Sequence, residues 1–191
     1  MSWKKEIGRK AIHLSWGIVL LTYLQLEKSH GKAALWLPAT LFISFLLIDY
    51  FRIQHSFKIP LFWRLLHDKE EEKLFTPTTT MAGMTIALAV FSREIAVAAI
   101  TMMVLGDVAA NIFGKLLGKT KIGDKTLEGA AAGLATNLLI GFLMINSLLT
   151  VAVMASVAAA TELYTTKLDD NMLIILFAGT AGQLTLTLLF L

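Results

Sequence analysis

Long apolar runs separated by short polar stretches make up most of the 191-residue chain. An α-helix needs about 20 residues to cross the ~30 Å hydrocarbon core of a bilayer. Seven runs approach or reach that length, and they cover roughly residues 11–26, 33–51, 78–92, 94–117, 129–146, 148–163 and 172–191. The pattern therefore predicts an all-α, polytopic membrane protein with about seven transmembrane helices.

The composition agrees with a chain buried in lipid. Hydrophobic residues make up 56% of the sequence, and the mean hydropathy is +0.68. The chain has three prolines, no low-complexity stretch and no internal repeat, so we expect one integral-membrane domain over residues 1–191. It has no cysteine, which excludes disulfides and thiolate metal sites.

Lysine and arginine are divided unequally between the two sides that seven crossings would create. The N-terminus and the loops near residues 52–77, 115–128 and 164–171 hold 14 of the 17. Because cytoplasmic loops carry the excess of these residues, we predict a cytoplasmic N-terminus and an outer C-terminus. The membrane would be a cell inner membrane, or an ER-type membrane in a eukaryote. The basic residues lack interleaved aromatic residues, which argues against nucleic-acid binding.

One long loop, about residues 56–77, lies on the predicted cytoplasmic side. Pro60 suits the first position of a helix, and the apolar residues that follow it share one helical face. They are Leu61, Phe62, Leu65 and Leu66. The segment is either a short helix lying in the membrane interface or a connector packed on the bundle.

A polar stretch, "GDVAANIFGKLLGKTKIGDKTLEG" at residues 106–129, interrupts the apolar pattern. At helical spacing Asp107, Asn111, Gly114 and Gly118 share one face. Glycines four residues apart are typical of helix–helix packing. A carboxylate inside a span costs roughly 3 kcal/mol or more, so Asp107 is expected to face a polar cavity or a functional partner.

Four lysines follow Asp107 within the same stretch, and Glu128 follows them. They are Lys115, Lys119, Lys121 and Lys125. Lysines neutralise phosphate oxygens, and carboxylate oxygens suit Mg²⁺. The set therefore indicates a site for a metal-bound polyphosphate, which is not a P-loop because that motif is absent.

Further polar residues come from three other places on the predicted cytoplasmic side. They are Arg9, Lys10 and His13 near the start; Asp49 and Arg52 after the second apolar run; and Glu162, Asp169, Asp170 and Asn171 before the last run. Each group has a structural alternative: a hydrogen-bonded core histidine, a local ion pair and a helix N-cap, respectively. Their convergence on one side nevertheless indicates a functional site at the cytoplasmic face.

The spacing of the polar stretch resembles the nucleotide-binding signature of the CTP-dependent lipid kinases, the family of dolichol, phytol and fungal-type diacylglycerol kinases. The matching residues are Asp107, Ala110, Gly114 and Gly118, followed by Lys125, Thr126, Glu128 and Gly129. The resemblance extends to "RKAIH", "DYFR" and the acids before the last run. This chain has Asp124 where eukaryotic members tend to have a second lysine.

The resemblance implies a membrane kinase that transfers the γ-phosphate of CTP, or of another nucleoside triphosphate, to the hydroxyl of a lipid alcohol. The alcohol would be a polyprenol, a phytol-like isoprenoid or diacylglycerol. Asp107, Glu162 and Lys125 would be catalytic. Mg²⁺ would be held by Asp107 with Glu128 or Asp170, and the substrate by Asp49 and Arg52. The implied nucleotide contacts are Asn111, Gly114, Gly118, Lys119, Lys121, Lys125, Thr126 and Gly129, with Arg9, Lys10 and His13 as further candidates.

Two other functions remain open from the sequence. A CTP-dependent cytidylyltransferase would make a CDP-lipid from related substrates, although the C-terminal residues typical of that family are absent. A small transporter would use Asp107 as an intramembrane coupling residue. Transporter sites lie near the bilayer centre, whereas the acids here fall at predicted cytoplasmic helix ends. The sequence selects neither the acceptor alcohol nor an oligomeric state.

Overall fold

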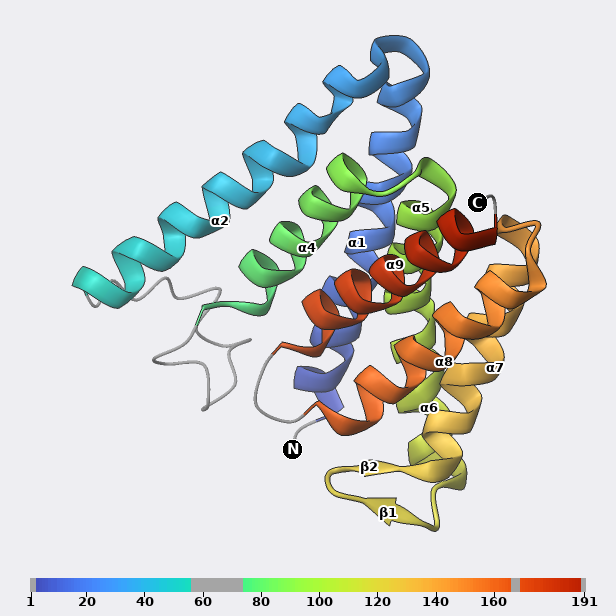
Figure 1. Ribbon diagram of the computed structural model, residues 1–191. Helices are drawn as coiled ribbons and strands as arrows, with labels where there is room; N and C mark the ends of the chain where they lie inside the picture. The colour runs from blue at the N-terminus through green and yellow to red at the C-terminus, as the bar shows by residue number, and fades with distance from the viewer. Residues whose placement is uncertain (1–2, 56–73, 166–168, 190–191) are drawn as a thin grey trace. The chain divides into compact units, whose positions relative to one another are not determined.

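The computed structural model describes residues 3–55, 74–165 and 169–189 (Figure 1). Within these ranges the protein is all-α, apart from one short β-hairpin. The helices are α1 (Trp3–His30), η1 (Gly31–Leu35), α2 (Trp36–His55), α4 (Thr76–Val90), α5 (Arg93–Thr101), η2 (Met102–Gly106), α6 (Asp107–Leu117), α7 (Leu127–Met144), α8 (Leu148–Tyr164) and α9 (Asp170–Leu189). The predicted helical class is confirmed.

Helices that are long and apolar enough to cross a membrane are present. In the described part of the chain there are four such stretches: His13–Gln54, Arg93–Leu117, Leu127–Met144 and Asp170–Leu189. Helix α8 is apolar but shorter. These helices are compatible with a membrane protein, whereas the predicted number of crossings and their direction stay predictions.

The chain divides into two compact units, Met1–Thr85 and Ile86–Leu191. In the first unit α1 and α2 are joined through η1, and Gly31 at the start of η1 has φ +56°, a conformation that favours glycine. Trp16 of α1 meets Phe45 of α2 edge to face, with ring centroids 6.3 Å apart. The first unit thus contains a helical hairpin closed by aromatic packing.

The second unit packs α7, α8 and α9 together with the stretch formed by α5, η2 and α6. Its core is aliphatic and rich in methionine. Members of this core are Ile95, Ala98, Ala99, Met102, Ile140, Ile145, Val151 and Met154. Helix η2 is a π-helical turn that inserts between α5 and α6 immediately before Asp107, and such turns occur frequently at functional sites.

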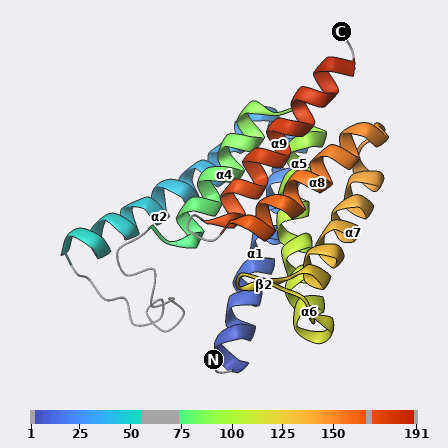
Figure 2. The ribbon, with the colours of Figure 1, turned by 60° about the horizontal axis from the view of Figure 1, so that its bottom comes forward.

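Helices α6 and α7 approach each other closely through glycines (Figures 1 and 2). A Cβ atom at Gly129 would lie 3.0 Å from the Cα of Gly114. A Cβ atom at Gly114 would lie 2.8 Å from Oγ1 of Thr126. These glycines therefore have the packing role expected of small residues between helices, and they bring the ends of α6 and α7 together next to the hairpin.

Candidate functional site

A pocket of about 170 Å³ opens in the second unit where the C-terminal half of α6, the β-hairpin, the start of α7 and the end of α8 meet. Its lining combines small, charged and apolar residues. The lining residues are Ala110, Asn111, Gly114, Lys115, Asp124, Lys125, Thr126, Gly129, Ala130, Glu162 and Leu163. Six of them are residues to which the family resemblance gives a catalytic or nucleotide-binding role: Asn111, Gly114, Lys125, Thr126, Gly129 and Glu162.

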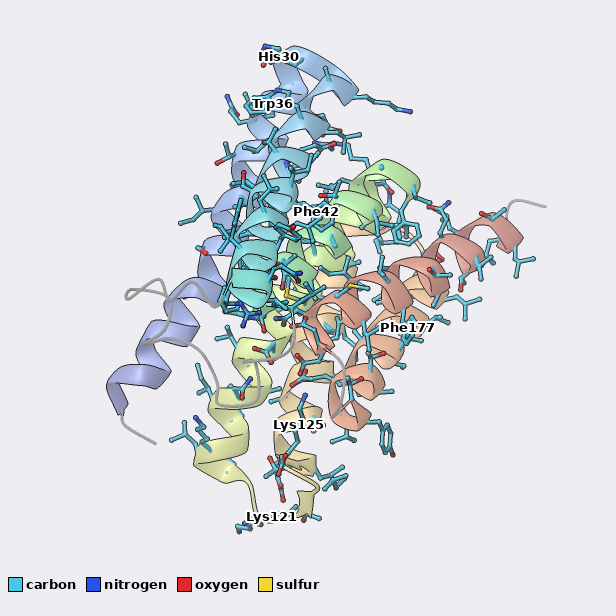
Figure 3. All side chains as sticks on the ribbon, turned by 90° about the vertical axis from the view of Figure 1, so that its left-hand side faces the viewer. His30, Trp36, Phe42, Lys121, Lys125 and Phe177 are labelled. Atoms are coloured by element: carbon cyan, nitrogen blue, oxygen red, sulfur yellow. The ribbon has the colours of Figure 1, made fainter. Side chains whose placement is uncertain are left out.

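The β-hairpin carries Lys125 to the pocket. Strands β1 (Lys121–Ile122) and β2 (Lys125–Thr126) pair antiparallel, with Ile122 opposite Lys125. Gly123 has φ +60° at the turn, where glycine is favoured because it has no Cβ. Lys121 lies opposite Thr126, at the end of the hairpin away from the turn, and is apart from Lys125 (Figure 3).

Thr126 begins helix α7. Its extended backbone and its side-chain oxygen, which accepts a hydrogen bond from the Gly129 N–H at 3.2 Å, make it the N-cap. The close contact between Gly129 and α6 begins at the same place. The Thr-x-x-Gly part of the predicted signature is therefore explained by helix capping and helix packing, and both residues also face the pocket.

Glu128 is occupied by the backbone of the loop before the hairpin. Both of its carboxylate oxygens accept from the Thr120 N–H, at 3.1 and 3.2 Å, and the Leu127 N–H donates to the Thr120 carbonyl at 2.9 Å. Glu128 does not line the pocket. Its geometry thus accounts for a role in bracing the loop, and its predicted role as a metal ligand stays a prediction.

Lys125 connects the hairpin to the C-terminal end of α8 and to the N-terminal end of α9 (Figure 3). Its Nζ lies 2.9 Å from Oδ2 of Asp170 and 4.0 Å from Oε1 of Glu162, and it donates to the main-chain carbonyl of Glu162. The side chains of Lys125 and Asp170 are 30% and 32% exposed. The structure therefore brings together three predicted residues from segments far apart in the sequence, within reach of solvent.

Glu162 is buried, with 6% of its surface exposed. Among the described residues no donor forms a hydrogen bond to its carboxylate, and the nearest cation is the ammonium of Lys125 at 4.0 Å. Gly133 makes room for it, since a Cβ atom there would stand 3.4 Å from Oε2. Buried polar groups are nearly always hydrogen-bonded, so a carboxylate that faces a pocket without a donor is a candidate for ligand binding.

Asp107 and Asn111 form a pair along α6. The Asn111 side-chain amide donates to Oδ1 of Asp107 at 2.8 Å and to its main-chain carbonyl at 2.9 Å. Asn111 lines the pocket, whereas Asp107 does not. Asp107 still interacts electrostatically with Glu162, as does Asp170.

The acids are near one another but do not form a ready-made metal centre. In the part of the chain that the structure describes, no group of three or more histidine, aspartate or glutamate residues is placed to hold a metal ion. The predicted ligands, Asp107 with Glu128 or Asp170, are only two carboxylates, so the absence of a larger group does not test them and their role stays a prediction. Mg²⁺ commonly takes only one or two carboxylates together with substrate phosphates, so a pair such as Asp107 and Asp170 would be enough.

Other predicted residues lie outside the pocket lining. Lys119 and Lys121 are exposed, and Gly118 packs on Thr126, whose Cγ2 would be 2.7 Å from a Cβ atom at Gly118. His13 is half-buried on α1, in the first unit. The side chains of Arg9 and Lys10, and residues 56–73 of the predicted interfacial segment, lie outside the described residues.

Two further charged residues line the pocket, namely Lys115 and Asp124. Lys115 is one of the four lysines assigned to a polyphosphate, and it follows Asn111 by four residues on the same face of α6. Asp124 had no predicted role in the site. Asp124 reaches the pocket because the hairpin folds back. No spacing rule for a helix would have found it.

Asp49 and Arg52, the predicted substrate-binding pair, form a closed cluster in the first unit. Oδ1 of Asp49 accepts from Nε and Nη2 of Arg52 at 3.2 and 2.9 Å. Oδ2 accepts from the Phe75 N–H at 2.9 Å and from the Thr78 hydroxyl at 2.6 Å. Arg52 also stacks on Phe75, 3.9 Å from the ring centroid. The cluster joins the end of α2 to the start of α4, and a substrate role for the pair stays a prediction.

Asp169 confirms the N-cap predicted before the last helix. Its Oδ1 accepts a hydrogen bond from the Met172 N–H at 3.2 Å. Capping by Asp169 leaves Asp170 available for Lys125. The adjacent acids thus have different tasks.

No family model, no curated protein and no solved structure matches this chain. The family resemblance of the motif accordingly stays a prediction. In its described residues the protein is α-helical apart from one hairpin, with long apolar helices and a pocket lined by charged, small and apolar residues in its second unit. Its function has to be argued from that pocket.

Proposed function

We propose that the protein is a membrane-embedded kinase that transfers the γ-phosphate of CTP, or of another nucleoside triphosphate, to the hydroxyl of a lipid alcohol. The observation that carries the proposal is the meeting of Lys125, Glu162 and Asp170 beside a pocket at the ends of apolar helices. An ammonium group, acids and an apolar surface are what phosphoryl transfer to a lipid requires in one place.

The charges of the pocket favour a metal-bound nucleotide. Two lysines, Lys115 and Lys125, and two acids, Asp124 and Glu162, are among its lining residues. Such a balanced set does not neutralise a triphosphate by itself. Mg²⁺, held by Asp170 with Asp107, would supply the missing positive charge at the phosphates. Asp107 and Asp170 support this assignment because both lie within electrostatic reach of Glu162.

The residues of the chain then divide the work. Lys125 and Lys115 neutralise phosphate oxygens, and the glycines of α6 and α7 let the phosphates approach the backbone. Glu162 accepts the proton of the attacking hydroxyl. Leu163 and Ala130 provide the apolar side of the pocket, where the lipid chain leaves it. Positioning and charge neutralisation account for most of the rate in this chemistry.

The membrane arrangement belongs to the same proposal. About seven helices cross the bilayer, the N-terminus and the pocket lie on the cytoplasmic side, and the C-terminus lies outside. CTP is available there. The 14 lysines and arginines predicted on that side support this orientation.

The decisive experiment measures which phosphate of a labelled nucleotide is transferred to the lipid. Purified protein is incubated with lipid alcohols and with CTP or ATP labelled at either the α- or the γ-phosphate. Label from the γ-phosphate in the lipid fraction is the expected result. Label from the α-phosphate with a phosphorylated lipid as acceptor would indicate a cytidylyltransferase, and no transfer of either label to any lipid would contradict the proposal and leave the transporter.

Two lysines of the hairpin provide a matched pair of variants. Lys125→Met removes the ammonium beside the pocket, and we expect turnover to fall at least ~100-fold, as when one key electrostatic element is removed from a preorganised site. Lys121→Met makes the same chemical change at an exposed lysine outside the pocket lining, and its turnover should stay within about twofold of the parent. Equal losses in both would show that the hairpin is needed for folding only.

A further inference from the structure

A buried amide on α7 has no role in the pocket. Asn137 lies in the middle of this helix with 2% of its surface exposed, and it is not among the residues that line the pocket. Among the described residues, its Oδ1 has no hydrogen-bond partner. A buried acceptor without a donor destabilises a fold, so its presence needs a compensating reason.

The amide of Asn137 lies against the backbone of Gly106, the last residue of the π-helical turn η2. A Cβ atom at Gly106 would overlap Oδ1 of Asn137 and would lie 3.0 Å from its Cγ and 3.1 Å from its Nδ2. One turn earlier on α7, a Cβ atom at Gly133 would lie 3.4 Å from the carbonyl oxygen of Gly106. Gly106 is therefore enclosed by two successive turns of α7, and only a glycine leaves room for the amide.

This contact restrains the π-helical turn. A π-turn contains one residue more than an α-turn, so it shifts the residues that follow by about 100° around the helix axis. Irregular backbone of this kind persists only where the surrounding structure holds it. The Asn137 amide seated on Gly106 is such a restraint, because it contacts the turn at its last residue.

The turn decides where Asp107 points. Asp107 is the first residue of α6 and follows Gly106 directly. Its Oδ1 accepts a hydrogen bond from the Asn111 side chain at 2.8 Å, and Asn111 lines the pocket. Asp107 also interacts electrostatically with Glu162. If the turn lost its extra residue, Asp107 would rotate relative to these neighbours.

We propose that Asn137 is a positioning residue: its amide, seated on Gly106, holds the π-helical turn and thereby aims the Asp107 carboxylate at the metal-bound phosphates. The part that concerns the metal rests on the proposed kinase function, whereas the part that concerns the turn does not. Residues that orient a metal ligand from behind typically change metal affinity 10- to 100-fold when they are replaced.

The first test compares Asn137→Ala with Ile140→Ala. Ile140 is a buried core residue one turn further along α7, so its truncation also leaves a cavity but does not touch Gly106. In Asn137→Ala, the concentration of Mg²⁺ that gives half-maximal activity should rise at least ~10-fold. In Ile140→Ala it should stay within about twofold of the parent, because a folding defect lowers the maximal rate without shifting this midpoint.

Asn137→Leu separates aim from packing. Leucine fills the site and leaves no polar atom unpaired, so a defect caused by the cavity alone would be repaired. Its tetrahedral branch cannot lie flat on Gly106 as the planar amide does. The Mg²⁺ midpoint should therefore stay raised, and a return to the parent value would overturn the inference.

The second test measures geometry without activity. The chain has no cysteine, so Leu116→Cys on α6 and Leu143→Cys on α7 introduce the two spin-label sites of the protein. Both leucines are exposed, at 73% and 75%. Side chains extend about 5–6 Å from a helix axis, so a rotated α6 moves its label by several ångström. Pulsed EPR should show a shifted or broadened distance distribution in Asn137→Ala and an unchanged one in Ile140→Ala.

The outcomes separate this inference from the proposed function. If the parent phosphorylates lipid alcohols but Asn137→Ala keeps the Mg²⁺ midpoint of Ile140→Ala, the role of Asn137 is wrong while the kinase stands. An unchanged distance distribution in Asn137→Ala would overturn its hold on the turn. If the parent phosphorylates no alcohol, the proposed function fails and the link to the metal with it, and the distance measurement still decides whether Asn137 holds the turn.

Discussion

Each unit contains one cluster of acidic and basic side chains, and the two clusters differ in how many hydrogen bonds their buried carboxylates accept. Asp49 is fully buried, and its two oxygens accept four hydrogen bonds from Arg52, Phe75 and Thr78. In the second unit, Lys125 and Asp170 are about one-third exposed, and the buried carboxylate of Glu162 accepts no hydrogen bond from the described residues. In the first cluster the buried carboxylate has all its hydrogen bonds, whereas in the second the oxygens of Glu162 can still accept hydrogen bonds.

This difference favours a structural role for the first cluster and supports the proposed ligand-binding role of the second. A carboxylate that already has all its hydrogen bonds gains little from a substrate and loses much when its partners move. A carboxylate that faces a pocket without a donor gains from a ligand that brings one. The Asp49–Arg52 pair is therefore best explained as a structural connection between α2 and α4, and the Lys125 cluster as the functional one.

The largest expected effect comes from breaking the complete cluster. Asp49→Asn removes the charge that compensates Arg52 and turns one acceptor into a donor facing the Phe75 N–H. Removing one partner of a buried ion pair typically costs 3–5 kcal/mol, and we expect a loss of about that size in the free energy of unfolding. Equilibrium unfolding in detergent micelles measures it.

Lys125→Met makes the corresponding change in the cluster of Lys125, Glu162 and Asp170. The free energy of unfolding should change by less than about 1 kcal/mol, because the ion pair of Lys125 is partly solvated. If Asp49→Asn instead unfolds like the parent and raises KM for the lipid alcohol, the pair binds substrate as the sequence resemblance implies. The comparison between the two clusters would then be wrong.

The two clusters also show how far the sequence could predict the structure. Helices were predictable because each apolar run is long enough to require one. Asp49 and Arg52 were recognisable as a pair at i, i+3, but the groups that complete the cluster follow 26 and 29 residues later. No local sequence pattern reveals these distant partners, so a structural ion pair and a functional one cannot be distinguished from the sequence alone.

The pocket was predicted in part, for a similar reason. Asn111 and Gly114 followed from helical spacing on α6, and Lys125 from its place in the motif. The contact between Lys125 and Asp170 spans 45 residues, and Asp124 faces the pocket only because the hairpin turns at Gly123. The π-helical turn η2 leaves no signal in its sequence "MMVLG". Tertiary folding decides these features.

The next prediction concerns the carboxylate of Glu162, which accepts no hydrogen bond from the described residues. Glu162→Gln keeps the size of the side chain but cannot take a proton from the hydroxyl, so we expect turnover to fall about 100-fold, or about 2.7 kcal/mol in activation free energy. The free energy of unfolding should change little, because a glutamine of the same size replaces a buried side chain that accepts no hydrogen bond from the described residues. A loss of stability together with full turnover would show that Glu162 belongs with the structural cluster instead.

The smallest effect, and the finest test of the comparison, concerns Asp170. Asp170→Asn keeps a polar side chain beside Lys125 but weakens any bond to a metal ion. If Asp170 helps to hold Mg²⁺, the concentration of Mg²⁺ that gives half-maximal activity should rise about 10-fold, or about 1.4 kcal/mol in binding free energy. The KM for the nucleotide at saturating Mg²⁺ should then change little.

The opposite result, an unchanged Mg²⁺ requirement with a raised nucleotide KM, would assign Asp170 to positioning Lys125 alone. Because the two side chains are about one-third exposed, the free energy of unfolding should change by less than about 1 kcal/mol in either case. Titrations of Mg²⁺ and nucleotide on one preparation distinguish these results, since a folding defect would lower the maximal rate without shifting either midpoint.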